Sequence, residues 1–184
     1  RNGGPNDYGT VFAVNTDGTG YASLHVFNRN DGAYPVGGLV LSGATLYGTA
    51  ENGGATDNGT VFAINTDGSG FTNLYSFGGG SDGALPVAGL LLSGTTLYGT
   101  AKFGGANGNG TVFAINTDGS GFTNLYSFSS GGSDGASPAA GLILSGNTLY
   151  GTTMWGGANG NGAVFGINTD GSGFTNLYSF SSGG

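Results

Sequence analysis

The stretch TVFAINTDGSGFTNLYSF fills residues 111–128, and residues 60–77 repeat it letter for letter. Its Val-Phe pair returns at intervals of 50, 51 and 52 residues (11 to 61, 61 to 112, 112 to 164). A period of this length is the signature of a repeat architecture, in which one supersecondary unit is copied along the chain. We therefore predict one repeat array over residues 1–184, with about four units, the first and last incomplete, whose Val-Phe strands start near Val11, Val61, Val112 and Val164.

Each unit contains short runs rich in β-branched and aromatic residues, bounded by Gly, Asn, Asp and Ser, which is typical of strands. In the third unit the runs are Thr111–Asn116, Phe122–Phe128, Gly141–Leu144 and Thr148–Thr152. An Asp-Gly pair separates the first two runs and supplies the positive backbone angles of a tight hairpin. We predict that these runs form one four-stranded antiparallel meander.

The apolar pattern indicates that both faces of each meander are covered. Residues 89–92 are apolar almost throughout, whereas residues 71–77 alternate. Sheets packed on both faces produce this mixture. One meander cannot bury two faces alone, so neighbouring units must stack face to face, with glycines where backbones approach closely. Radial stacking gives a β-propeller and linear stacking gives an open β superhelix; the repeat length and strand number favour an all-β, propeller-like array of blades.

The two kinds of hairpin do not occur equally often. The Val-Phe hairpin appears four times, whereas the Leu-Ser-Gly/Leu-Tyr-Gly-Thr hairpin appears three times, at Leu39–Thr49, Leu90–Thr100 and Leu142–Thr152. Unpaired strand edges and apolar faces favour association. We expect either a window on a longer array or self-association through the repeat ends, in which neighbouring chains complete one another as a closed ring or a filament.

The composition excludes several classes of protein. The chain has no Cys, one His, three Lys and Arg together, ten Asp and Glu together, and a formal net charge of −7. These numbers exclude disulfide scaffolds and Cys-based metal sites, and the negative charge repels nucleic acids and anionic membranes. No apolar run reaches the ~18 residues of a membrane helix. We therefore expect no cofactor, no nucleic-acid partner and no membrane insertion.

A family resemblance rests on the fourth unit. It resembles the GloVer repeat, named for Gloeobacter and Verrucomicrobia, in the pattern of Leu149–Thr153, Gly156-Gly157, Asn161-Gly162, Val164-Phe165, Ile167–Gly171 and Leu177–Phe180. The resemblance covers essentially the whole chain and implies an extracellular or cell-surface repeat protein of bacteria. The Leu-Tyr strand followed by a Gly-Gly doublet is also similar to a kelch blade, which adds weight to the propeller.

Few side chains suit catalysis. A hydrolytic triad needs a His as base, and the one candidate, His25, stands where the other units have Tyr75, Tyr126 and Tyr178. Glu51 and Asp57 form the one acidic pair outside the repeating positions and are the candidate carboxylates of a hydrolase. Their Gly- and Asn-rich loop offers no apolar pocket to raise a carboxyl pKa. We predict that the protein is not an enzyme.

Two further sets of residues are candidate binding sites. The turn aspartates could offer oxygen ligands to Ca²⁺, although each turn supplies fewer than the six to eight oxygens that the ion prefers. Aromatic rings near the Gly-Gly doublets, with neighbouring amides, are candidate glycan contacts, and packing between units is their alternative role. The calcium candidates are Asp17, Asp67, Asp118 and Asp170, and the glycan candidates are Tyr8, Phe103, Trp155, Asn109 and Asn161.

These observations favour a non-enzymatic extracellular structural or adhesive repeat protein that forms a surface scaffold or a head-to-tail fibre. The alternative is a lectin-like propeller with one weak carbohydrate site per blade, in which multivalency raises the affinity for a polysaccharide.

Overall fold

The computed structural model describes residues 3–129 and 133–182. All of its regular elements are strands, which confirms the all-β prediction. In chain order they are β1 (Thr10–Ala13), β2 (Ala22–Val26), β3 (Val40–Ser42), β4 (Thr45–Ala50), β5 (Thr60–Asn65), β6 (Thr72–Ser76), β7 (Leu91–Ser93), β8 (Thr96–Ala101), β9 (Thr111–Asn116), β10 (Thr123–Ser127), β11 (Ile143–Ser145), β12 (Thr148–Thr153), β13 (Ala163–Asn168) and β14 (Thr175–Ser179).

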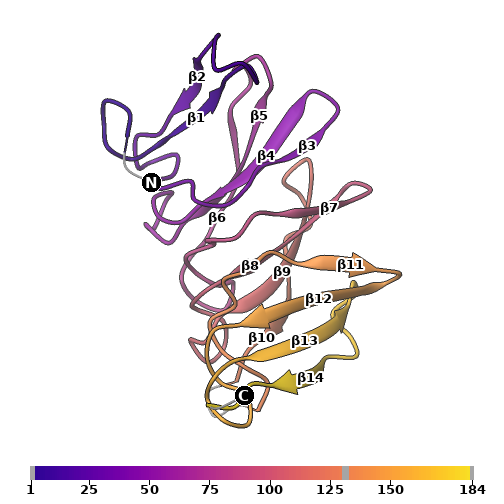
Figure 1. Cartoon of the computed structure of the whole chain (residues 1–184). Helices are drawn as coiled ribbons and strands as arrows, with labels where there is room; N and C mark the ends of the chain where they lie inside the picture. Colours follow the sequence, from indigo (N-terminus) through magenta and orange to yellow (C-terminus); the bar gives the residue numbers. More distant parts are fainter. Residues whose placement is uncertain (1–2, 130–132, 183–184) are drawn as a thin grey trace.

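The strands form four antiparallel sheets, each in chain order. The first sheet holds β1 and β2, and three four-stranded sheets follow: β3 to β6, β7 to β10 and β11 to β14. They succeed one another along the molecule and do not close into a ring (Figure 1). The predicted propeller-like array of four-stranded meanders is therefore confirmed, in the form of an open or partial propeller.

The predicted grouping of the strands into meanders is wrong by one hairpin. The hairpin of β9 and β10 pairs with β7 and β8, which precede it, and not with β11 and β12. The pairing of β8 with β9 spans six residues on each strand, from Thr96 opposite Asn116 to Ala101 opposite Thr111. The glycine-containing loop 102–110 folds the chain straight back along β8, whereas the longer connection after β10 carries it to the next sheet. With this grouping the first sheet has two strands and the last has four.

A glycine in the second strand of each full sheet makes room for a phenylalanine of the third. Gly99 lies opposite Phe113, and a β-carbon at Gly99 would lie 2.5 Å from the end of the Phe113 ring. The same contact recurs between Gly151 and Phe165. The Leu-Tyr-Gly-Thr motif therefore contains Gly because an aromatic ring crosses its backbone.

Neighbouring sheets stack face to face, as predicted. We call the face of each sheet that meets the preceding sheet its leading face and the opposite one its trailing face. In the sheet of β7 to β10, the leading face buries Phe113 and Ile115 against the preceding sheet, and the trailing face buries Val112 and Phe128 against the following one. A third cluster joins β1 and β2 to the sheet of β3 to β6. The cores of this protein thus lie between its sheets.

Ring stacking is the recurring contact between sheets. Tyr75 on a trailing face lies parallel to Phe122 on the next leading face, with ring centroids 3.8 Å apart and planes 2° apart. Tyr126 and Phe174 repeat the same geometry. Phe77 closes the group from the side, with its ring 5.2 Å from Phe113 and tilted by 69°. Such aromatic pairs contribute about 0.5–1.5 kcal/mol each beyond their buried area.

Close backbone contact occurs where the connections between sheets pass one another. A β-carbon at Gly37 would lie 2.7 Å from the Ala88 carbonyl group, so only glycine fits there. Thr49 also donates its hydroxyl to the Ala88 carbonyl across a distance of 2.9 Å. These contacts confirm the expectation that glycines allow the backbones of neighbouring units to approach. Within the described part of the chain, no helix is long and apolar enough to cross a bilayer.

Replacing Phe113 by Ala should lower the free energy of unfolding by about 3–5 kcal/mol, because the buried ring leaves a cavity between two sheets. Phe12 provides a matched control: it occupies the same repeat position but is 55% exposed on β1. Phe12→Ala should change stability by no more than about 0.5 kcal/mol. Urea unfolding at low protein concentration measures both values. Equal losses would show that stacking between sheets does not carry the stability.

Candidate functional site

Three junctions with equivalent main-chain hydrogen bonds lie along one edge of the array. Three segments meet at each junction. They are the loop between the second and third strands of a full sheet, the connection that leads into that sheet, and the corresponding loop of the preceding unit. The residues of junction 1 are Tyr8, Tyr34 and Asn52, those of junction 2 are Asn58, Leu85 and Phe103, and those of junction 3 are Asn109, Ser137 and Trp155.

Main-chain hydrogen bonds hold every junction in the same way. At junction 1, the Tyr34 N–H donates to the Tyr8 carbonyl at 2.7 Å. Ala33, which precedes Tyr34, forms an antiparallel bridge with Asn52. At junction 2, the Leu85 N–H donates to the Asn58 carbonyl at 2.8 Å, and the adjacent bridge involves Phe103. Because these bonds involve only the backbone, the side chains at the junctions can differ without changing the fold.

The glycan candidates named from the sequence all lie along this edge. Phe103 and Trp155 occupy equivalent positions at junctions 2 and 3 and are 41% and 59% exposed. Tyr8 belongs to junction 1 and Asn109 to junction 3, where the Asn109 side chain donates to the Ser129 carbonyl at 2.9 Å. Asn161 is exposed in the last loop, and its amide donates to the Asn159 carbonyl. The structure therefore brings aromatic rings and amides of different units to one edge.

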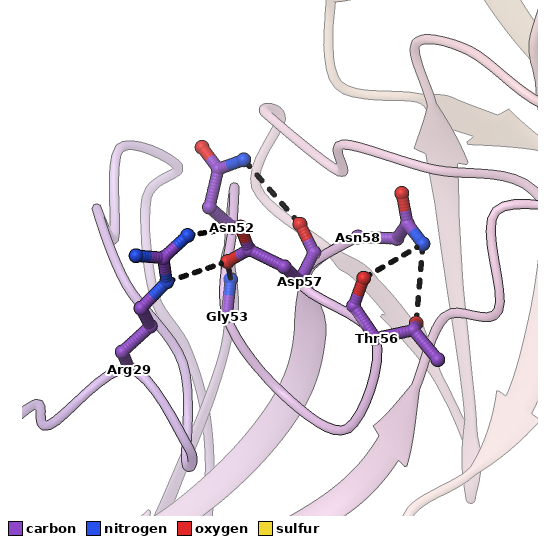
Figure 2. A network of polar contacts seen from close by, with 6 residues as sticks. All are labelled: Arg29, Asn52, Gly53, Thr56, Asp57 and Asn58. Atoms are coloured by element: carbon purple, nitrogen blue, oxygen red, sulfur yellow. Dashed lines mark hydrogen bonds and ion pairs between the residues drawn. The ribbon is translucent and has the colours of Figure 1, made fainter.

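Junction 1 contains a polar cleft that the sequence analysis missed. The cleft has a volume of about 160 Å³ and is lined by Tyr8, Arg29, Ala33, Tyr34, Asn52 and Asp57. Arg29 holds Asp57 through two parallel contacts: Nε donates to Oδ1 at 3.1 Å, and a terminal nitrogen donates to Oδ2 (Figure 2). The Gly53 N–H also donates to Asp57 Oδ1, at 3.0 Å. The sequence gives no direct signal for this pair, because 28 residues separate its partners.

The ion pair shifts both of its groups toward the charged state. Hydrogen bonding to Arg29 holds the pKa of Asp57 below its ordinary value, with the Gly53 N–H acting in the same direction and slight burial opposing it. The Asp57 carboxylate in turn raises the pKa of Arg29. A general acid for glycoside hydrolysis needs a raised pKa. The lowered pKa of Asp57 is therefore the opposite of what a general acid requires. Glu51, its partner in the candidate pair, donates its N–H to the Tyr34 carbonyl at 3.1 Å.

The four turn aspartates lie at the opposite edge of the sheets from the junctions. Each is occupied within its own turn: Asp118 accepts hydrogen bonds from the Ser120 N–H at 2.9 Å and from the Ser120 hydroxyl at 2.6 Å. The hydroxyl bond is the main reason that the pKa of Asp118 is lowered. Among residues 3–129 and 133–182, no group of three or more His, Cys, Asp or Glu could hold a metal ion. The structure thus does not gather the calcium candidates into one site.

His25 occupies the place of a stacked tyrosine. Its ring lies parallel to that of Phe71, with centroids 3.6 Å apart, and Nε2 lies 3.2 Å from Asp31 Oδ2. The corresponding tyrosine hydroxyls donate to an aspartate, as Tyr75 does to Asp82 at 3.1 Å. Burial, assisted by Asp82, raises the pKa of Tyr75 to about 12. This placement on β2 agrees with the sequence, in which His25 stands where the other units have tyrosine.

The stacked meanders define a tandem-repeat protein of the β-propeller-like class. Residues 1–184 match the model of the Gloeobacter/Verrucomicrobia repeat, and the chain belongs to this family. The resemblance read from the sequence is therefore confirmed. A comparison with curated proteins finds no match.

Solved structures share the fold at low sequence identity. A chain of the crystal structure of a nidogen/laminin complex is 16% identical with a TM-score of 0.62; the alignment covers 96% of this chain and 57% of that one. TolB from Acinetobacter baumannii is 14% identical with a TM-score of 0.57, over 92% of this chain and 37% of that one. This chain thus spans less than two thirds of either structure. Both neighbours are β-propeller-like proteins, so the comparison shows the fold.

His25 should make the protein sensitive to mild acid. Burial lowers its pKa below the ordinary 6.5, and Asp31 only partly opposes this shift. The unfolded chain therefore takes up a proton at a higher pH than the folded chain does, and stability should fall as pH drops below about 6.5. His25→Tyr restores the residue of the other units and should flatten this dependence. Urea midpoints between pH 7.5 and pH 5 provide the measurement; the same slope in both proteins would contradict the assignment.

Proposed function

We propose that the protein is a non-enzymatic structural repeat protein of the bacterial cell surface that builds a scaffold by head-to-tail packing of its sheets. The observation that carries this proposal is the apolar character of the two outermost faces. Each exposes residues whose repeat equivalents are buried or partly buried between sheets. Family membership supports the surface location, because the resemblance implies extracellular arrays.

The trailing face of the sheet of β11 to β14 is the first of these surfaces. Ile143, Leu177 and Tyr178 are all more than half exposed there. Their equivalents in the preceding sheet pack against the core between two sheets, where Tyr126 stacks on Phe174. Tyr178 has the same edge contact with Phe180 that Tyr126 has with Phe128, at 5.2 Å in both cases. The surface is therefore already arranged to receive a leading face.

The leading face of β1 and β2 is the complementary surface. Phe12, Val14 and Tyr21 are exposed there, whereas Phe113 and Ile115, which are equivalent to the first two, are fully buried. The rings of Phe12 and Tyr21 stack with centroids 5.7 Å apart, the same separation as between Phe113 and Phe122. A second copy could thus place Tyr178 over Tyr21 and repeat an internal interface. Such a heterologous contact extends into a filament or closes into a ring.

The polar groups support a role without catalysis. His25 is packed in a ring stack, and Asp57 is engaged by Arg29, so neither is poised as a base or an acid. Incubation with chromogenic glycosides and esters should release no product above that of a Glu51→Gln variant. Activity that disappears in Glu51→Gln would overturn the non-enzymatic proposal.

Head-to-tail packing predicts a specific pattern of masses. The unmodified chain should form species whose mass grows with concentration, and Tyr178→Asp or Phe12→Asp should each reduce this growth, because a carboxylate would be buried at the interface. The Tyr178→Asp variant keeps its leading face, and the Phe12→Asp variant keeps its trailing face. A mixture of the two variants should therefore form heterodimers and no larger species. Sedimentation velocity and light scattering measure these masses.

Trp155→Asp is the matched control, since Trp155 is as exposed as Tyr178 but lies at junction 3. This variant should associate like the unmodified chain. A monomer across a wide concentration range for the unmodified protein would overturn the scaffold proposal.

A second candidate function is binding of saccharides along the junction edge. It is favoured by the exposure of Phe103 and Trp155 at equivalent positions, with amides nearby. Aromatic rings held open to solvent on a rigid backbone suit the apolar faces of sugar rings, and several such sites in one array would add avidity. A glycan array that stays silent for the assembled protein would remove this candidate.

A further inference from the structure

The repeat itself shows where side chains are not needed for the fold. Residues 60–77 and 111–128 are identical, so the core strands and turns of these two units carry no variation. Equivalent positions at the junctions carry different residues: Tyr34, Leu85 and Ser137 at one position, and Asn52, Phe103 and Trp155 at another. A constant framework that presents different side chains at one edge is the arrangement expected of a recognition surface.

At junction 1, two side chains stand where the backbone favours glycine. Arg29 and Asp57 have φ angles of 70° and 64°, in the left-handed region. Gly79 and Gly108 stand at the corresponding positions of the next unit, each with a φ of 79°. Glycine adopts this conformation freely, whereas a residue with a side chain adopts it at an energetic cost. The next unit folds with glycine at both positions, so the fold does not require the Arg29–Asp57 pair.

The chemistry of the cleft points to a neutral ligand rich in hydroxyl groups. Arg29 and Asp57 compensate each other's charge, and the net charge of −7 on the chain repels anions. The lining offers donors and acceptors together: guanidinium and carboxylate, the Asn52 amide, and the Tyr8 and Tyr34 hydroxyls. The two tyrosine rings lie 6.3 Å apart at a 58° tilt and add apolar surface. Sugar hydroxyls donate and accept at once, and a sugar ring presents C–H groups to aromatic faces.

We propose that the cleft at junction 1 is a binding site for one unit of a neutral saccharide, and that Phe103 and Trp155 at junctions 2 and 3 stack on further units of the same chain. This inference rests on the saccharide-binding candidate above and deepens it. The junctions then differ in their contacts: junction 1 recognises hydroxyl groups, and the other two supply apolar platforms. The cleft then determines which sugar is bound, and the rings of Phe103 and Trp155 contact the neighbouring sugar units of the polysaccharide.

The repeat supplies matched variants for the test. Arg29→Gly and Asp57→Gly install the residues of the equivalent positions at junction 2, which the fold already accepts at the same backbone angles. The probes are the hexasaccharides of β-1,4-linked glucose, mannose and xylose, with the corresponding monosaccharides. Calorimetry measures affinity. Trp155, the only tryptophan in the chain, reports on junction 3 through its fluorescence.

We expect at least one hexasaccharide to bind the unmodified chain, and Arg29→Gly and Asp57→Gly to weaken that binding about tenfold or more. The matching monosaccharide should shift the amide NMR signals of Arg29, Asn52 and Gly53, and leave the Trp155 signal in place. Trp155→Ala and Phe103→Ala should weaken binding of the hexasaccharide and leave binding of the monosaccharide unchanged.

The outcomes separate the cleft from the wider function. If the unmodified chain binds none of the three hexasaccharides, the saccharide-binding function and the cleft are both overturned. If a hexasaccharide binds with equal affinity to the unmodified chain and to the two glycine variants, only the assignment of the cleft is overturned. Unchanged urea midpoints in the glycine variants would exclude loss of folding as the cause of weaker binding.

Discussion

The parallel contact between a tyrosine on one sheet and a phenylalanine on the next is the interaction on which the structure depends. Tyr75 with Phe122, and Tyr126 with Phe174, place their rings 3.8 Å apart, each flanked by a buried phenylalanine. A four-stranded sheet of this size has no core of its own, so it is stabilised by its neighbours. The same contact specifies the order of the sheets, because each four-stranded sheet presents tyrosine on its trailing face and phenylalanine on its leading face.

The structure explains why some positions of the repeat are constant and others vary. The stacking faces, the Gly99–Phe113 contact and the hairpin turns each require particular residues, and the same residues recur along the chain. The junctions are held by main-chain hydrogen bonds, which leave their side chains free to change. The proposed scaffold role and the proposed saccharide site are therefore compatible: the first would use the faces of the sheets, and the second would use one edge.

Part of the candidate site could be predicted from the sequence and part could not. Exposed aromatic rings next to Gly-Gly doublets pointed to Phe103 and Trp155, because a fixed offset from a repeated motif recurs at a fixed place in the fold. The Arg29–Asp57 pair gave no such signal, because its partners lie 28 residues apart, on the connection that enters a sheet and on a loop of that sheet, and only the fold brings them together. The Tyr75–Asp82 hydrogen bond was missed for a related reason: the loop between the two residues changes length from unit to unit, which hides the correspondence.

The sequence by itself determined the all-β class, the repeat length, the hairpins and the need for sheets to cover one another, since these follow from local turn chemistry and from apolar periodicity. Only the tertiary structure decided which hairpins share a sheet, because both possible groupings satisfy the same strand pattern and differ in which connection folds back. It also decided that the junctions lie along one edge and the turn aspartates along the other. Position across a sheet is set by strand direction and register, and these are properties of paired strands that a single strand does not carry.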